Sequence, residues 1–115
     1  MASATVDAAR QIEAPAIIVI TSSGFSGRLV SSYRPSVPIF AVTTDPVTYR
    51  QLAAVWGVRP VLWEGDEVTY EKLYDFGRRC VVESGWGEPG QAIPVTAGHP
   101  FHLAGTTNTM RIEVL

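Results

Sequence analysis

The sequence is poor in charged residues and has a single cysteine, and each scarcity excludes a class of protein. Charged residues make up 17% of the chain, and 9 Lys and Arg against 11 Asp and Glu give a net charge of -2. A chain without a basic stretch is not expected to bind nucleic acid. Cys80, the one cysteine, cannot form a disulfide within the chain, which fits a reducing compartment. We therefore predict a cytoplasmic protein with no nucleic-acid partner.

Long apolar runs are also missing. The longest apolar stretch, Ala14 to Ile20, contains Pro15 and is far shorter than the about 20 residues that cross a bilayer. Residues 1–7 lack the basic start and apolar run of a secretory signal. We expect neither a membrane partner nor export. A length of 115 residues, 46% of them apolar, predicts one domain over residues 1–115.

Two continuous β-branched runs, residues 16–20 and 39–43, are typical of strands buried on both faces of a parallel sheet, the first of them central. Apolar spacing and capping signals predict helices over about 4–13, 26–32, 46–55 and 68–84, and strands over 58–63, 92–97 and 109–114. Ser3 could cap the first helix, and Asp45 followed by Pro46 is a cap with a first-turn proline that opens the third. The loop from Gly98 to Thr107 leaves no room for a crossover helix, so the last two strands should be antiparallel. The predicted fold class is α/β, with helices on both faces of a mostly parallel mixed sheet.

The loop Thr21-Ser22-Ser23-Gly24-Phe25-Ser26 follows the first predicted strand and enters a helix. In open α/β sheets, ligands bind beyond the carboxyl ends of the strands. Free backbone N–H groups, hydroxyls and the helix dipole all favour an anion there, and a glycine lets the backbone approach closely. The loop predicts a phosphate site. The alternative, that Ser and Thr only cap the helix and form the turn, is equally compatible with the composition.

No credible catalytic set is present. Gly24-Phe25-Ser26 superficially resembles the nucleophile elbow of serine hydrolases, with His99 or His102 as a base, but Arg28 stands where the second glycine should be. Two histidines are too few for a structural metal, and the chain has no Walker lysine, dinucleotide-binding glycine motif or carboxylate cluster for magnesium. We expect neither metal nor cofactor, and most aromatic residues should pack in the core.

Landmarks along nearly the whole chain resemble the C-terminal domain of pyruvate kinase. They are Ala16-Ile17-Ile18-Val19-Ile20-Thr21, Gly24, Ser26, Ser31, Tyr33-Arg34-Pro35, Pro38-Ile39, Ala41-Val42-Thr43, Leu52, Trp56-Gly57-Val58 and Pro60, followed by Thr96-Ala97-Gly98, Pro100 and Gly105-Thr106-Thr107-Asn108. The last group is the most specific, because its spacing before a final strand is similar to the ending of many bacterial pyruvate kinases.

The resemblance implies a three-layer αβα sandwich over a five-stranded mixed sheet with an antiparallel last strand. It implies that the loop from Thr21 to Ser26 cradles a phosphate of an effector, and that a lid carrying Gly98, His99, Pro100 and Gly105 folds over it. It also implies a homo-oligomer, with the helix from Ala4 to Ile12 and the strand from Met110 to Leu115 at a subunit interface. The family's barrel domain, with its magnesium and potassium, is a further implied partner that these residues do not contain.

Two departures from the family bear on the effector. Ser22 stands where members activated by fructose 1,6-bisphosphate have a lysine, and no basic and aromatic pair for a second phosphate is evident between Asp66 and Phe76. A sugar monophosphate or AMP is therefore expected rather than the bisphosphate. The resemblance implies a regulatory, non-catalytic domain of pyruvate kinase. The alternatives are a free-standing phosphate-ligand module and, less favoured, a serine hydrolase.

Overall fold

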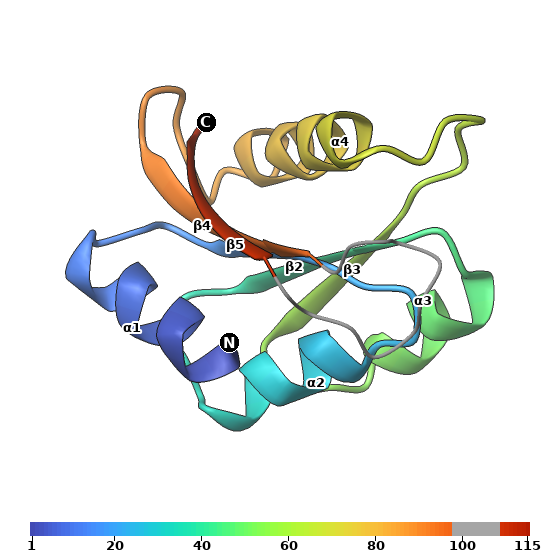
Figure 1. Cartoon of the computed structure of the whole chain (residues 1–115), viewed down its shortest axis with the longest axis horizontal. Coiled ribbons are helices and arrows are strands. Elements are labelled where there is room, and N and C mark those ends of the chain that lie inside the picture. The colour runs from blue at the N-terminus through green and yellow to red at the C-terminus, as the bar shows by residue number, and fades with distance from the viewer. Residues whose placement is uncertain (98–108) are drawn as a thin grey trace.

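The computed structural model describes residues 1–97 and 109–115, whose strands form one sheet in the order β3-β2-β1-β4-β5 (Figure 1). The strands are β1 (Ile17–Ile20), β2 (Ile39–Thr43), β3 (Val58–Leu62), β4 (Ala92–Ala97) and β5 (Thr109–Val114), and the helices are α1 (Ala2–Gln11), α2 (Phe25–Ser32), α3 (Pro46–Leu52) and α4 (Tyr70–Glu83). The predicted α/β class is confirmed, as is the central position of the first strand.

The sheet is parallel except at one edge. β1 pairs in parallel with β2 and with β4, and β2 pairs in parallel with β3. β5 runs antiparallel to β4, from Ala92 opposite Val114 to Ala97 opposite Thr109. The predicted antiparallel last pair is therefore correct.

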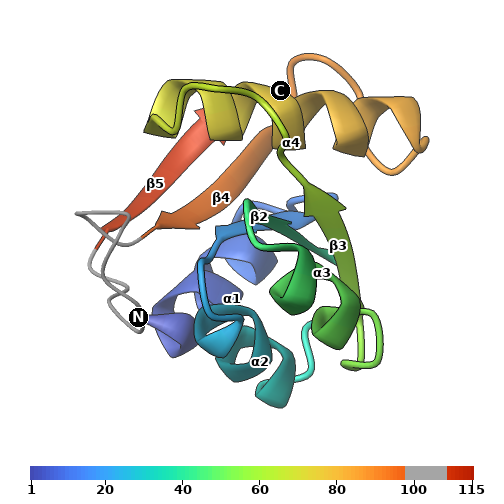
Figure 2. The same ribbon diagram turned by 90° about the vertical axis from the view of Figure 1, so that its right-hand side faces the viewer.

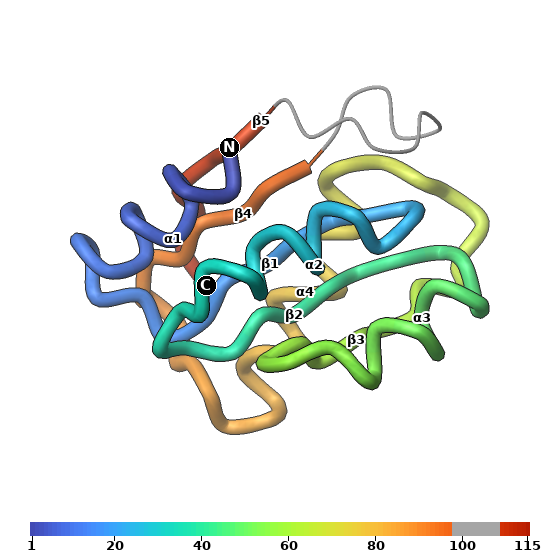
Figure 3. Tube along the Cα trace, turned by 90° about the horizontal axis from the view of Figure 1, so that it is seen from below, coloured from blue at the N-terminus to red at the C-terminus, as the bar shows by residue number. Residues whose placement is uncertain are grey.

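The helices divide unequally between the two faces of the sheet, with α1, α2 and α3 on one face and α4 alone on the other (Figures 1 and 3). Successive side chains of a strand point to opposite faces, so Ile17 and Val19 join the core under the three helices, while Ile18 and Ile20 join the core under α4. All four residues of β1 are buried. Among the described residues, no helix is both long and apolar enough to cross a bilayer.

Three predictions are wrong: the start of the first helix, the end of the third helix and the burial of most aromatic residues. Ser3 lies inside α1 and does not cap it, because the helix begins at Ala2, two residues before the predicted start, with Met1 as its N-cap. α3 ends at Leu52, because the chain from Ala53 onward tightens into turns that lead to Gly57, at φ 72. Several aromatic residues expected in the core lie at the surface instead. They are Tyr33, Tyr49, Trp56 and Trp86, of which the two tryptophans lie under the guanidinium groups of Arg34 and Arg59.

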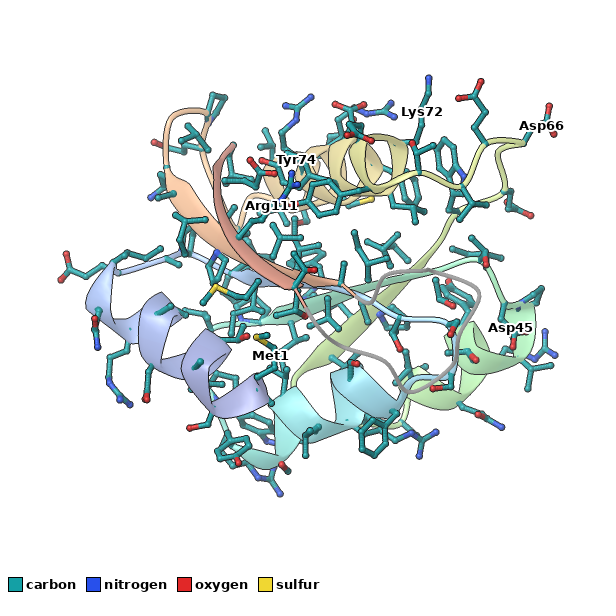
Figure 4. The ribbon with its side chains drawn as sticks, viewed as in Figure 1. Met1, Asp45, Asp66, Lys72, Tyr74 and Arg111 are labelled. Atoms are coloured by element: carbon teal, nitrogen blue, oxygen red, sulfur yellow. The ribbon has the colours of Figure 1, made fainter. Side chains whose placement is uncertain are left out.

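Two phenols on α4 tie this helix to the last strand. The hydroxyl of Tyr70 donates to Glu113 Oε2 at 2.8 Å, and the hydroxyl of Tyr74 donates to the carbonyl of Val114 at 2.9 Å. The guanidinium of Arg111 lies 4.6 Å from the centre of the Tyr70 ring. Figure 4 shows Tyr74 and Arg111 between α4 and β5. Burial, and secondly the hydrogen bond to the Glu113 carboxylate, raise the pKa of Tyr70 well above its usual value.

We expect stability to fall in alkali through Tyr70. Its folded-state pKa is raised, so its contribution is complete below the unfolded phenol pKa of about 10 and is lost as the pH rises above it. The free energy of unfolding should fall by up to about 1.4 kcal/mol per pH unit for this phenol. In urea unfolding between pH 9 and 11.5, the free energy of unfolding should fall less steeply with pH for Tyr70→Phe than for the wild type. Equal slopes would contradict the assignment.

Candidate functional site

The loop from Thr21 to Gly24 lies at the carboxyl ends of the parallel strands (Figure 2). The N–H of Thr21 still pairs with the carbonyl of Val42, one residue before the end of β2. Gly24 is then the N-cap of α2, whose first residue is Phe25. The geometry expected from the sequence, a loop between a central strand and a helix N-terminus, is therefore present.

Two loop hydroxyls accept hydrogen bonds from the backbone at the start of α2. Thr21 Oγ1 accepts from the N–H of Gly24 at 3.0 Å, and Ser23 Oγ accepts from the N–H of Phe25 at 3.3 Å. These two side chains thus form the turn that leads into α2, although the N-cap itself is Gly24 and has no side-chain cap. This turn does not exclude an anion, because a hydroxyl that accepts a hydrogen bond keeps its own hydrogen for donation.

Two backbone donors of the same loop are left over. Within residues 1–97 and 109–115, the N–H groups of Ser22 and Ser23 donate to no protein acceptor. Ser23 is exposed and Ser22 is half-buried. The N-terminus of a helix adds partial positive charge beside them. The loop therefore offers backbone and hydroxyl donors to a negatively charged group arriving from solvent.

Gly24 is required both by its backbone angle and by its surroundings. Its φ is 87, in the left-handed region that side chains with a Cβ disfavour, and a Cβ would lie 3.3 Å from both Leu52 Cδ2 and Thr48 Cγ2. Leu52 is fully buried and also lies beneath Gly27 in the first turn of α2. α3 thus supports the loop from below.

The other predicted site residues differ in exposure, and some lie outside the described residues. Phe25 is exposed and Ser26 is only 7% exposed. Such burial makes Ser26 a poor candidate for a nucleophile that must meet substrate. The proposed lid residues Gly98, His99, Pro100 and Gly105, and the alternative base His102, lie outside the described residues. In the part of the chain that is described, no three His, Cys, Asp or Glu residues gather as metal ligands.

Sequence reasoning missed the residues that support the loop from α3. Thr48 Oγ1 donates to the carbonyl oxygen of Ser22 at 2.9 Å, across a separation of 26 residues in sequence. The capping pattern at Asp45 and Pro46 predicted the start of α3, which is confirmed by the hydrogen bond from the N–H of Val47 to Asp45 Oδ1. That pattern contains no signal for which loop the first turn of α3 would contact.

Helices on both faces of a five-stranded mixed sheet define the chain as an α/β sandwich domain, and comparisons with known proteins show its family. The family model described as "Pyruvate kinase, alpha/beta domain" matches residues 1–113. The pyruvate kinase of Clostridium acetobutylicum is 37% identical over 111 residues, which are 96% of this chain and 23% of the relative. That of Lactobacillus delbrueckii subsp. bulgaricus is 36% identical over 110 residues, or 96% of this chain and 18% of the relative.

A third relative, the pyruvate kinase of Staphylococcus epidermidis, is 41% identical over 107 residues, covering 93% of this chain and 18% of the relative. The chain belongs to the pyruvate kinase alpha/beta domain family. It spans between 18% and 23% of the length of these relatives.

Replacing Gly24 should cost more stability than replacing a glycine of similar backbone angle in open space. Gly57 has φ 72 and nothing within 4 Å of a Cβ, so Gly57→Ala isolates the backbone penalty of about 1–2 kcal/mol. Gly24→Ala should lower the free energy of unfolding by that amount and by a further contribution from the close contacts of the new Cβ with Leu52 and Thr48. Urea unfolding measures both, and an equal loss in the two variants would contradict a supporting role for α3.

Proposed function

We propose that this chain is the regulatory domain of a pyruvate kinase and binds a phosphorylated effector in the loop from Thr21 to Ser26. The observation that carries the proposal is the pair of N–H groups, of Ser22 and Ser23, that lack acceptors in the described structure beside the N-terminus of α2. Membership of the alpha/beta domain family supports it. Three or four charge-assisted hydrogen bonds of roughly 1.5–3 kcal/mol each support micromolar affinity after ordering costs.

The proposed effector carries one phosphate. Ser22 supplies no charge, and the stretch from Glu64 to Glu67 at the end of β3 carries three carboxylates without a cation. These features favour a sugar monophosphate or AMP over fructose 1,6-bisphosphate, whose second phosphate needs its own cations.

The proposed homo-oligomer contact uses α1 and β5. β5 is an edge strand, and its residues Ile112 and Val114 are 48% and 62% exposed. They lie opposite Pro94 and Ala92 of β4. Ile12, at the end of α1, is also exposed. An uncovered edge with apolar side chains is suited to pairing with a second copy.

In this proposal, phosphoenolpyruvate and ADP are converted to pyruvate and ATP in glycolysis by a barrel domain outside these residues, in the cytoplasm, with magnesium and potassium held by that barrel. Effector binding would shift the subunit arrangement, and a coupling of about 1–3 kcal/mol changes substrate affinity several-fold or more. A free-standing phosphate-binding module would use the same loop without a barrel. The mass of the native polypeptide separates these two candidates.

We expect at least one phosphorylated ligand to raise the melting temperature of the chain. AMP, ribose 5-phosphate and fructose 1,6-bisphosphate would be titrated in a thermal-shift assay, with adenosine and ribose as matched ligands that lack phosphate. A ligand at 100-fold its Kd adds about 2.7 kcal/mol to the free energy of unfolding. Ser22→Asp should weaken binding at least tenfold, because the new carboxylate repels the phosphate.

Ser36→Asp is the matched control, since Ser36 is an exposed serine in the loop that enters β2, at the amino ends of the parallel strands. It adds the same charge and should leave the ligand-induced rise in melting temperature unchanged. The effector proposal fails if no phosphorylated ligand shifts the melting temperature, or if both aspartate variants respond alike.

Charging the free edge should break the proposed subunit contact. Ile112→Lys places an ammonium group on the exposed apolar side of β5 and should lower the molar mass measured by light scattering after gel filtration. Val47→Lys, which changes another exposed apolar residue on α3, is the control and should leave the mass unchanged. A wild type that is monomeric at about 100 µM, far above a micromolar Kd, would contradict the contact.

A further inference from the structure

The hydroxyl of Thr48 connects the first turn of α3 to the candidate loop. Thr48 is only 4% exposed, and its Oγ1 donates to the carbonyl oxygen of Ser22 at 2.9 Å. The same hydroxyl lies 3.1 Å from Asp45 Oδ2. A hydroxyl has one hydrogen, so the two oxygens share it, and the nearer of them is the carbonyl of the loop.

Asp45 fixes the position of Thr48. The carboxylate of Asp45 accepts from the N–H of Val47 at 3.0 Å, and the N–H of Asp45 donates to Thr43 Oγ1 at 3.2 Å. Thr43 is the last residue of β2 and is fully buried. Figure 4 shows Asp45 at the start of α3. The hydroxyl that contacts the loop is thus held on the end of a core strand.

The contact at the Ser22 carbonyl dictates where the next N–H points. The carbonyl of Ser22 and the N–H of Ser23 belong to one planar peptide unit, and in the trans form they point in opposite directions. Because the carbonyl faces Thr48, the N–H of Ser23 faces away from α3. Ser23 is exposed, and its N–H has no acceptor among residues 1–97 and 109–115.

We infer that Thr48 is a positioning residue, which orients the Ser22–Ser23 peptide so that the N–H of Ser23 donates to a phosphate oxygen of the ligand. This inference rests on the proposed phosphate site and assigns a function to a side chain that does not touch the ligand. Without the Thr48 hydroxyl, the peptide unit loses the partner of its carbonyl and can rotate about the adjacent bonds. Ligand affinity then falls because one donor is no longer held in place.

Two pairs of variants isolate the hydroxyl. Wild type and Thr48→Val differ by a hydroxyl replaced with a methyl, and Thr48→Ser and Thr48→Ala differ by one oxygen. The second pair keeps the test available if the valine variant does not fold. The two proteins with the hydroxyl should bind ribose 5-phosphate and inorganic phosphate at least tenfold more tightly than their partners without it, as measured by calorimetry and by titration of the Ser23 amide resonance in NMR spectra.

Ser31→Ala is the matched control for stability. Ser31 is buried, and its hydroxyl donates to a backbone carbonyl, that of Trp56, across 25 residues in sequence, but at the end of α2 away from the loop. The variant should lower the melting temperature and leave ligand affinity within twofold of wild type. A parallel loss of affinity in Ser31→Ala and Thr48→Ala would show a merely structural effect and overturn the inference.

A measurement without ligand distinguishes this inference from the proposed phosphate site. The Ser23 amide resonance should move, and its exchange with solvent should change, in Thr48→Val and Thr48→Ala but not in Thr48→Ser. An unchanged Ser23 amide overturns the positioning role even where the wild type binds phosphate. If the Ser23 amide moves in these variants but the wild type binds neither ribose 5-phosphate nor inorganic phosphate, the phosphate site is overturned instead. The donation from Ser23 to a ligand is then overturned with it.

Discussion

The burial of β1 on both faces is the constraint on which the other features depend. Its four residues lie in two separate cores, with Ile17 and Val19 beneath α1, α2 and α3 and Ile18 and Ile20 beneath α4. A strand in this position cannot slip by one residue without exchanging the contents of both cores. The loop that leaves its carboxyl end therefore has a fixed starting point, as the proposed phosphate site requires.

The candidate loop combines two uses of the same few residues. Thr21 and Ser23 satisfy the N–H groups of Gly24 and Phe25, so the turn is stable without a ligand. The hydroxyl hydrogen of the exposed Ser23 and the N–H groups of Ser22 and Ser23 remain available to an anion. Turn formation by Thr and Ser is therefore compatible with an anion in this loop, because acceptor and donor functions lie on different atoms.

Sequence patterns predicted the fold better than they predicted the site. β-branched runs such as Ile17–Ile20, and the capping of α3 by Asp45, depend on local preferences and were confirmed. The hydrogen bond from Thr48 to Ser22 and the contact of Leu52 with Gly24 join segments far apart in the chain. No periodicity encodes such contacts. The surface positions of Trp56 and Trp86 were missed because stacking with Arg34 and Arg59 satisfies an aromatic ring outside the core.

The attachment of β5 has a consequence for how the sheet opens. β5 has a strand neighbour on one side only, and beyond its ladder with β4 it is held by the phenols of Tyr70 and Tyr74 and by the backbone hydrogen bonds of Leu115. β1, in contrast, is flanked by strands on both sides. In amide hydrogen exchange, β5 should therefore detach as a separate cooperative unit, at a lower free energy than the strands around β1. A surface that pairs with another chain would then also open more readily than the strands around β1, and pairing would stabilise it selectively.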